Sequence, residues 1–143
     1  MGTISTLYKG DMLFVSRARH HKLTVDAPSS TGGNKRGPTP PEVFIALLGS
    51  CVAATVADYS ERKGIDVRGM EVVVSYDKAE HPARLVNIDV RVDLPGTTAS
   101  ELDLKALRQV AQHCLVQKIM VNLEEVSFEI VGEPVSLTAA AYG

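Results

Sequence analysis

Apolar and polar side chains alternate along several short segments of the chain, which is the pattern of strands that bury one face. The clearest examples are Val86–Leu94, in which every second residue is apolar, and the preceding segment Met70–Lys78. Other segments rich in β-branched and aromatic residues, separated by turn residues, predict further strands. They are Thr3–Tyr8, Met12–Ser16 and Lys22–Asp26 in the first part of the chain, and Val126–Val131 in the last.

The longest apolar segment lies between these groups of strands and predicts a helix. The segment Pro28–Pro41, rich in Gly, Ser, Thr and Pro, is a loop that leads into it. Thr39 is placed as the N-cap, with Pro40 in the first helical position and Glu42 completing a capping box. The helix runs to about Lys63, where a glycine follows. Its first half is apolar on almost every face, so most of it must be buried.

A second helix follows a Pro-Gly turn. Ser100 and Asp103 form its predicted cap. Its apolar stripe consists of Leu104, Leu107, Val110 and Ala111. Nothing in the segment Leu107–Leu123 breaks the helical pattern, which predicts one continuous helix with Cys114 on its apolar stripe.

The predicted order of elements is β-β-β-α-β-β-α-β, with no repeats and no separate linker. We therefore expect a single domain over residues 1–143 of the α+β class, with a largely antiparallel sheet wrapped around the apolar helix. With 45% hydrophobic residues, the chain can bury a real core. One sheet covers one side of the apolar helix, and the second helix covers part of the other. A partner subunit is expected to cover the remainder, so the sequence favours a homodimer.

The formal net charge is −2, which gives no electrostatic reason to expect binding to nucleic acid or to an anionic membrane surface. The first residues lack the basic-then-apolar order of a signal peptide. The longest uncharged apolar run, Val43–Ala57, has 15 residues, fewer than the roughly 20 that span a bilayer. We therefore expect a cytoplasmic protein, in which thiols stay reduced by default.

The only two cysteines are the main candidates for chemistry. Cys51 lies in the apolar helix, and no basic residue shares its helical face to stabilise a thiolate. Cys114 follows His113 and precedes Lys118 by about one turn, which is a better setting for an anion. Buried cysteines also pack as small hydrophobes. From these residues alone, inert core packing and a buried redox pair both stay open.

Other site chemistries lack their motifs. The chain has no C-x-x-C or H-x-x-x-H pair, and the neighbouring His20 and His21 would point to opposite sides of a strand. The Gly-Gly pair of the long loop lacks the surroundings of a phosphate-binding loop, and Gly49–Cys51 does not form a hydrolase nucleophile elbow. We therefore expect no metal site and no bound cofactor.

Four motifs follow one another in the first half of the chain: Asp26-Ala-Pro, Gly32-Gly33, Gly37-Pro-Thr-Pro-Pro-Glu42 and Leu47-Leu-Gly-Ser-Cys51. Together they resemble the first signature of the OsmC/Ohr family of osmotically inducible and organic hydroperoxide resistance proteins. The strand pair around His81–Arg84 and the ending from Cys114 to Ile130 look like the rest of that fold. The short Gly-Ser-Cys motif resembles the OsmC-like branch. The resemblance implies an intertwined homodimer, with sheets wrapped around central helices and active sites at the subunit interface.

The resemblance further implies a thiol-dependent peroxidase that serves in oxidative-stress defence. Cys51 would attack an organic hydroperoxide and become a sulfenate, and Cys114 would then close a Cys51–Cys114 disulfide. An external dithiol or lipoyl-type reductant would restore both thiols. A free cysteine with a pKa near 8.5 is only about 3% ionised at pH 7, so the nucleophile needs a cation nearby.

An assisting arginine and glutamate are also implied by the resemblance. Arg17, Arg19 and Arg36 compete for the first role. Arg17 and Arg19 point the same way along a strand, so spacing does not choose between them, and Arg36 in its loop is expected to be the least constrained. Glu42 lies about 180° around the helix from Cys51 and roughly 13 Å along it, so it can act only by holding an arginine. Its capping role is a sufficient explanation by itself.

Two alternatives to a peroxidase remain. An OsmC-like stress or small-molecule-binding protein would keep the fold and hold an apolar ligand without peroxidase turnover. A purely structural interpretation treats both cysteines as packing residues, so that replacing Cys51 by alanine would cost only a modest amount of stability.

Overall fold

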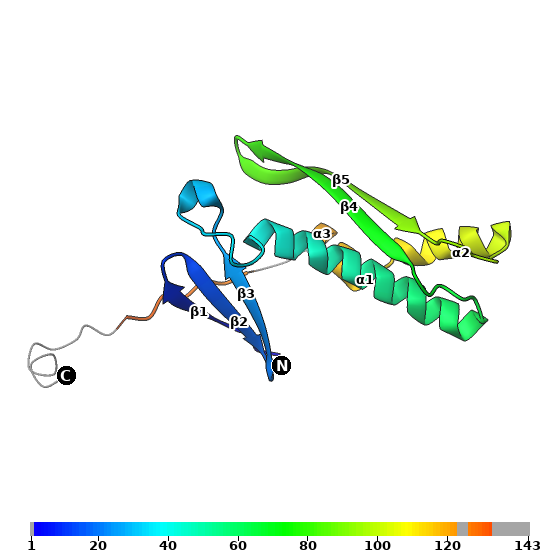
Figure 1. The fold of residues 1–143 in the computed structure, drawn as a ribbon, viewed down its shortest axis with the longest axis horizontal. Helices are drawn as coiled ribbons and strands as arrows, with labels where there is room; N and C mark the ends of the chain where they lie inside the picture. The colour runs from blue at the N-terminus through cyan, green and yellow to red at the C-terminus, as the bar shows by residue number, and fades with distance from the viewer. Residues whose placement is uncertain (1, 123–125, 133–143) are drawn as a thin grey trace, which may run out of the picture.

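The computed structural model describes residues 2–122 and 126–132. Within them, three N-terminal strands form one antiparallel sheet, and a β-hairpin packs with the α-helices to form the larger body (Figure 1). The elements are β1 Ser5–Gly10, β2 Leu13–Ala18, β3 His21–Asp26, the 3₁₀ helix η1 Ser29–Thr31, α1 Pro40–Lys63, β4 Glu71–Glu80, β5 Ala83–Asp93, α2 Glu101–Ala111 and α3 Leu115–Val121. The predicted α+β class and antiparallel pairing are confirmed.

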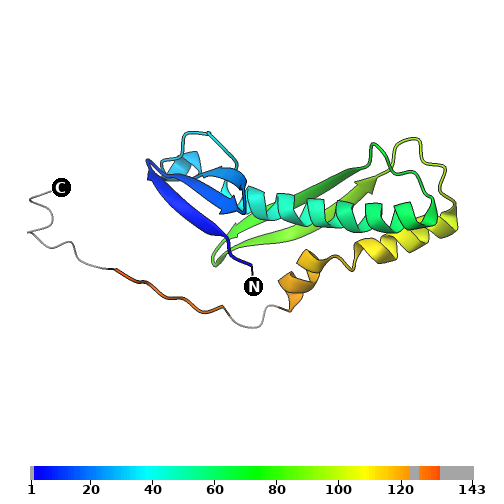
Figure 2. The same cartoon turned by 90° about the horizontal axis from the view of Figure 1, so that it is seen from below.

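The N-terminal sheet keeps the strands in chain order. β1 pairs with β2 and β2 with β3, and the register places Phe14 between Tyr8 and Val25 and sets Arg17 opposite Lys22. The predicted strands of this region are therefore confirmed, with small shifts at their ends. The sheet lies at the N-terminal end of α1, whereas the β4–β5 hairpin runs alongside this helix (Figure 2).

Helix α1 begins and ends where the sequence predicts. The backbone N–H of Thr39 donates to the Glu42 carboxylate at 3.0 Å. Gly64 ends the helix in the left-handed conformation, at φ 69°. One face of α1 packs against the β4–β5 hairpin, α2 and α3. The buried residues of α1 are Ile45, Leu48, Gly49, Val52, Val56 and Ser60.

The opposite face of α1 is open in the single chain. Phe44 is 40% exposed and Leu47 is 51% exposed, so the expectation that most of this helix is buried is wrong for one chain by itself. By length and composition alone, the helix is also apolar enough to cross a membrane, which the shorter uncharged run did not indicate. The core helix of a globular domain passes the same test, and α1 packs on both the hairpin and the other helices.

The prediction of one continuous helix over Leu107–Leu123 is wrong. Helices α2 and α3 are separate, and Cys114 lies between them in an extended conformation, with ψ 150°. The backbone N–H of His113 donates to the Val110 carbonyl at 3.0 Å, which tightens the end of α2 into a turn. This turn directs Cys114 into the core, and the restart of the helix supplies new partners for the backbone.

The strand predicted at Val126–Val131 is wrong for the single chain. Residues 126–132 have no strand partner and run away from the rest of the molecule (Figures 1 and 2). Phe128 is 90% exposed and Ile130 is 100% exposed. A strand forms only where a neighbouring edge shares its backbone hydrogen bonds, and among the described residues no strand pairs with this segment.

Candidate functional site

Both cysteines border one hydrophobic cluster. Its buried members are Leu48, Val52, Val56, Leu107 and Cys114, contributed by α1, α2 and the start of α3. Cys51 is half-buried and packs against this cluster from α1, whereas Cys114 is only 1% exposed. Two free thiols that are 63 residues apart in sequence (114 − 51 = 63) therefore border the same packed region.

Cys114 is the N-cap of α3. Its sulfur accepts a hydrogen bond from the backbone N–H of Gln117 at 3.4 Å. The neighbouring His113 side chain is engaged elsewhere, because its Nδ1 donates to the Gln109 carbonyl at 2.6 Å. The sulfur thus faces a backbone donor at a helix start, where negative charge is favoured. Sequence reasoning missed this position because no proline or glycine marks the break.

Cys51 is held by the regular backbone of α1. Its carbonyl accepts a hydrogen bond from the Thr55 hydroxyl at 2.8 Å. Among the described residues, no hydrogen bond or ion pair joins the Cys51 side chain to a cation. The sequence predicted that Cys51 has no cation on its own helix. In the described part of this chain, its side chain has no cationic partner from any other element either.

The two strand arginines lie on the N-terminal sheet. Arg17 is exposed on β2, and Arg19 is exposed in the β2–β3 turn with a left-handed backbone at φ 57°. No ion pair of the described chain includes either of them. A role for one of them beside the thiolate therefore stays a prediction.

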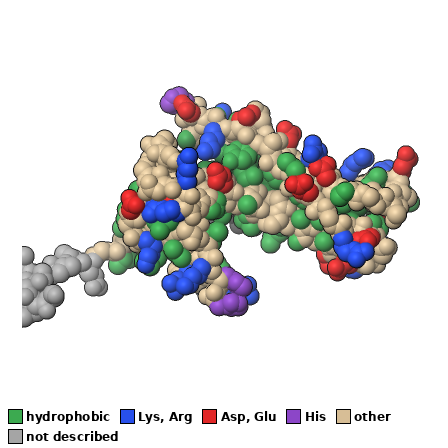
Figure 3. Space-filling view, viewed as in Figure 1, with side chains coloured by type: hydrophobic (Ala, Val, Ile, Leu, Met, Phe, Trp, Pro, Cys, Tyr) green, Lys and Arg blue, Asp and Glu red, His purple; other side chains and the backbone are tan. Residues whose placement is uncertain are grey.

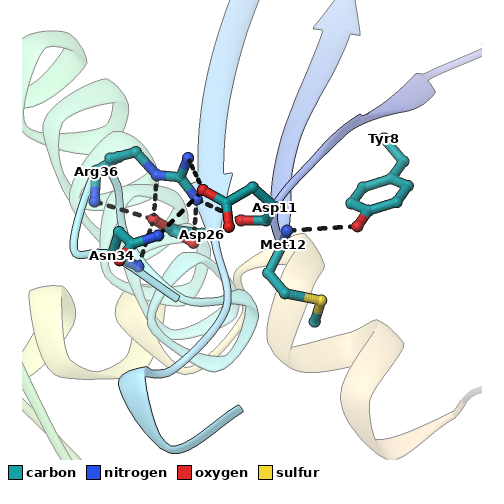
Figure 4. Close-up of polar contacts among 6 residues, drawn as sticks. All are labelled: Tyr8, Asp11, Met12, Asp26, Asn34 and Arg36. Carbon is teal, nitrogen blue, oxygen red and sulfur yellow. Dashed lines mark hydrogen bonds and ion pairs between the residues drawn. The ribbon is translucent and has the colours of Figure 1, made fainter. Parts of the chain in front are cut away.

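Arg36 is firmly held, so the expectation that it is the least constrained arginine is wrong. Its Nε donates to Asp26 Oδ2 at 2.8 Å and its Nη2 donates to Asp26 Oδ1 at 3.2 Å, a two-point ion pair (Figure 4). Nη1 also donates to the Asp11 carboxylate at 3.2 Å. Asp26 is fully buried, and this arginine is its charge partner.

The same aspartate organises the loop that leads into α1. Asp26 Oδ2 accepts backbone N–H groups from Asn34 and Arg36, each at 3.1 Å. The hydrogen bond from the Arg36 side chain holds the pKa of Asp26 well below its usual range, in opposition to the effect of burial. A Cβ at Gly33 would overlap the Ala27 carbonyl group, so the loop packs tightly against the residue that follows β3. In the sequence, the Asp26-Ala-Pro and Gly-Gly motifs were the signals from which this loop structure could have been predicted.

Glu42 serves as the helix cap. Its carboxylate accepts the Thr39 N–H, and it lies in the first turn of the same continuous helix that carries Cys51. This placement agrees with the helical geometry that separates the two side chains. A catalytic role for Glu42 through an arginine stays a prediction.

An apolar cavity of about 880 Å³ opens between α1, β5, α2 and α3. Its lining shares Leu48, Val52 and Val56 with the cluster that both cysteines border. Arg91, Arg108 and the side-chain amides of two glutamines add polar groups to the lining. The cavity is large enough for a small organic molecule, and neither cysteine is among its lining residues. Within residues 2–122 and 126–132, no group of three or more His, Cys, Asp or Glu residues is placed to hold a metal ion.

Comparison with known proteins agrees with this geometry. A family model described as OsmC-like protein matches residues 32–130. No curated protein matches the chain.

Several solved structures share the fold. A proposed osmotic stress induced and detoxification response protein of Psychrobacter arcticus 273-4 is 21% identical, with a TM-score of 0.76 over 82% of this chain and 87% of that one. An OsmC-like protein of Mycoplasma pneumoniae is 17% identical, with a TM-score of 0.73 over 86% and 89%. An organic hydroperoxide resistance protein OsmC of Legionella pneumophila is 14% identical, with a TM-score of 0.64 over 84% and 88%. At these identities the similarity establishes the fold.

Proposed function

This chain belongs to the OsmC-like protein family, and from that premise we propose that it is a thiol-dependent peroxidase that reduces organic hydroperoxides. Family membership and similarity to organic hydroperoxide resistance proteins support a function related to oxidative stress. The observation that supports the peroxidase proposal is the position of both cysteines at one hydrophobic cluster.

The proposed reaction has three steps. The Cys51 thiolate attacks the distal peroxide oxygen of ROOH, the O–O bond breaks, and the alcohol ROH leaves after protonation, with Cys51 oxidised to the sulfenic acid. The Cys114 sulfur then attacks the Cys51 sulfur, which forms the disulfide and releases water. An external dithiol, such as a lipoyl-type reductant, exchanges with the disulfide and is itself oxidised while both protein thiols are restored.

The positions of the two sulfurs suit this order of events. Cys51 is half-buried, so a hydroperoxide can reach it, whereas Cys114 is buried and protected from direct oxidation. The apolar side chains of the cluster that both cysteines border favour organic peroxides over hydrogen peroxide. Since no cation of the described residues is paired with the Cys51 side chain, Arg17 or Arg19 is proposed to stabilise the thiolate in the assembled protein, with Glu42 holding the arginine.

We propose that the assembled protein is a homodimer. A single chain leaves large apolar surfaces uncovered. They include Phe44 and Leu47 on α1, and Phe128 and Ile130 in residues 126–132. Such surfaces are typical of obligate interfaces. The proposal includes a cytoplasmic location, where a dithiol reductant is available, and no bound cofactor.

The test is a peroxidase assay with cumene hydroperoxide and either dithiothreitol or dihydrolipoamide. We expect the wild type to turn over, and Cys51→Ser to lose all activity. Cys114→Ser is the matched control, because it should still react once and leave a sulfenate that dimedone traps. Intact mass spectrometry should show a loss of about 2 Da on oxidation of the wild type only.

Turnover by Cys51→Ser, or peroxide treatment that consumes neither thiol, would reject the peroxidase. In that case the cavity favours the second candidate, an OsmC-like binding protein for an apolar small molecule. That candidate predicts an increase in melting temperature with ligand concentration in the absence of turnover.

A further inference from the structure

The apolar cavity between α1, β5, α2 and α3 differs in charge from the outer surface. On the face drawn in Figure 3, Lys and Arg side chains lie intermixed with Asp and Glu side chains. The cavity is lined by two arginines, Arg91 and Arg108, and no acidic residue is among the described residues that line it. Its volume of about 880 Å³ lies within the range of about 300–1,000 Å³ that is typical of small-molecule sites.

The two arginines of the cavity differ in how their charge is balanced. The Arg91 guanidinium donates to the Asp93 carboxylate at 2.9 Å and 3.0 Å. Arg108 lies in the last turn of α2, and none of the ion pairs within residues 2–122 and 126–132 includes it. Arg84 shares this property but does not line the cavity. What distinguishes Arg108 is therefore its position beside an apolar wall.

Helix α2 presents a graded series of side chains to the cavity. Leu104, Arg108 and Gln112 all line it, and successive members are four residues apart, so they lie one above another on the helix surface. Gln117 of α3 adds a second amide. Guanidinium and amide N–H groups both donate to a carboxylate, and the charged donor makes the stronger hydrogen bond. The polar part of the lining therefore suits an anionic group of a ligand.

We propose that this cavity binds an amphiphile composed of an alkyl chain and one carboxylate, with the carboxylate at Arg108. Leu48, Val52 and Val56 of α1 supply an apolar wall that removes the chain from water. Because Arg108 is exposed, a carboxylate paired with it keeps part of its hydration and avoids the cost of full burial.

The inference does not depend on the peroxidase reaction, because neither cysteine lines the cavity. It gives a chemical class to the ligand of the second candidate function. The surfaces proposed for the homodimer do not supply the occupant either. Their residues Phe44, Leu47, Phe128 and Ile130 are not among the residues that line the cavity.

The test compares two ligands that share one alkyl chain. Decanoate carries the carboxylate, decanol replaces it with a hydroxyl, and isothermal titration calorimetry of the full chain at low ionic strength measures both affinities. Arg108→Gln should weaken decanoate binding about threefold to fivefold, the range expected for an exposed ion pair, and leave decanol binding within about twofold. High salt should remove the same difference from the wild type.

The matched control is Arg84→Gln, which makes the same substitution at an exposed arginine outside the cavity. Both of its affinities should stay within about twofold of the wild type. Cys51→Ser should also bind decanoate normally, which separates this site from the proposed peroxidase. Ala111→Phe places a ring at a cavity-lining position of α2 and should weaken the binding of both ligands more than tenfold.

Three results would overturn the proposal. They are the absence of decanoate binding to the wild type, an equal loss of both ligands in Arg108→Gln, and a loss of decanoate in Arg84→Gln as large as that in Arg108→Gln. Size-exclusion chromatography of Ala111→Phe tests another occupant. A change of oligomeric state without a loss of decanoate binding would assign the cavity to a second copy of the chain and would also reject the proposal.

Discussion

Gly49 provides a test of how closely α1 approaches the β4–β5 hairpin. It is buried in the helix interior, two residues before Cys51. A Cβ at this position would lie 3.4 Å from Val74 Cγ2 and 4.0 Å from Val72 Cγ1, which is ordinary van der Waals contact. The same residues border a hollow of about 280 Å³, so the side chains have room to adjust. We therefore expect Gly49→Ala to fit without movement of the backbone.

Two effects favour the alanine. In a helix interior, alanine is more favourable than glycine by about 0.8–1 kcal/mol. Burial of one methyl group contributes up to about 0.8 kcal/mol more. The contact with the stiff Val74 side chain offsets part of this gain, which leaves a net stabilisation of about 1 kcal/mol. For a chain of this size the melting temperature should rise by about 3–5 °C.

Gly64→Ala is the matched control, because it makes the same substitution at the end of the same helix. Gly64 has a positive φ of 69°, so a Cβ is strained there even though no atom lies within 4 Å of it. This variant should lose about 1 kcal/mol. Thermal and urea unfolding followed by far-ultraviolet circular dichroism, at one fixed protein concentration, measure both changes. A lower melting temperature for Gly49→Ala would show that α1 and β4 are too close for a methyl group and would refute the reasoning.

Other predictions concern the loop before α1 and the cap of α2. Asp26→Asn should lower the melting temperature at neutral pH, because Asn34 and Arg36 lose their anionic acceptor. Since the folded-state pKa of Asp26 lies below its ordinary value of 3.8, the wild-type advantage should be complete above that pH, decline as the pH falls, and vanish below the folded-state pKa. A difference that does not shrink in melts below about pH 4 would contradict this assignment. Ser100→Ala removes the hydroxyl that accepts the Asp103 N–H at 3.1 Å and should cost about 1 kcal/mol in urea unfolding, whereas Ser100→Asp should retain most of the stability.

Local signals predicted much of the fold. The Thr39, Pro40 and Glu42 signal placed the start of α1, and Ser100 with Asp103 placed the start of α2, because a cap depends on residues within one turn of the helix. Alternating side chains located the β4–β5 pair, because a strand with one buried face shows its period directly, and β-branched and aromatic residues between turns located β1, β2 and β3. The sequence also identified both cysteines as the candidate thiols.

Features that depend on distant residues were missed. The helix break before Cys114 has no local marker, and burial of its side chain against α1 accompanies it. Arg36 looked unconstrained because its partners, Asp11 and Asp26, are 25 and 10 residues away. The segment Val126–Val131 has the alternation of a strand, but alternation cannot supply the edge with which a strand must pair.

The sequence by itself therefore determined the α+β class, the limits of the main helix and the identity of the two thiols, since each follows from short-range patterns. Only the tertiary structure decided that Cys51 and Cys114 border one hydrophobic cluster and that Arg36 serves Asp26. Packing brings together residues that are distant in the chain, and nothing in their local sequence records which of them will meet.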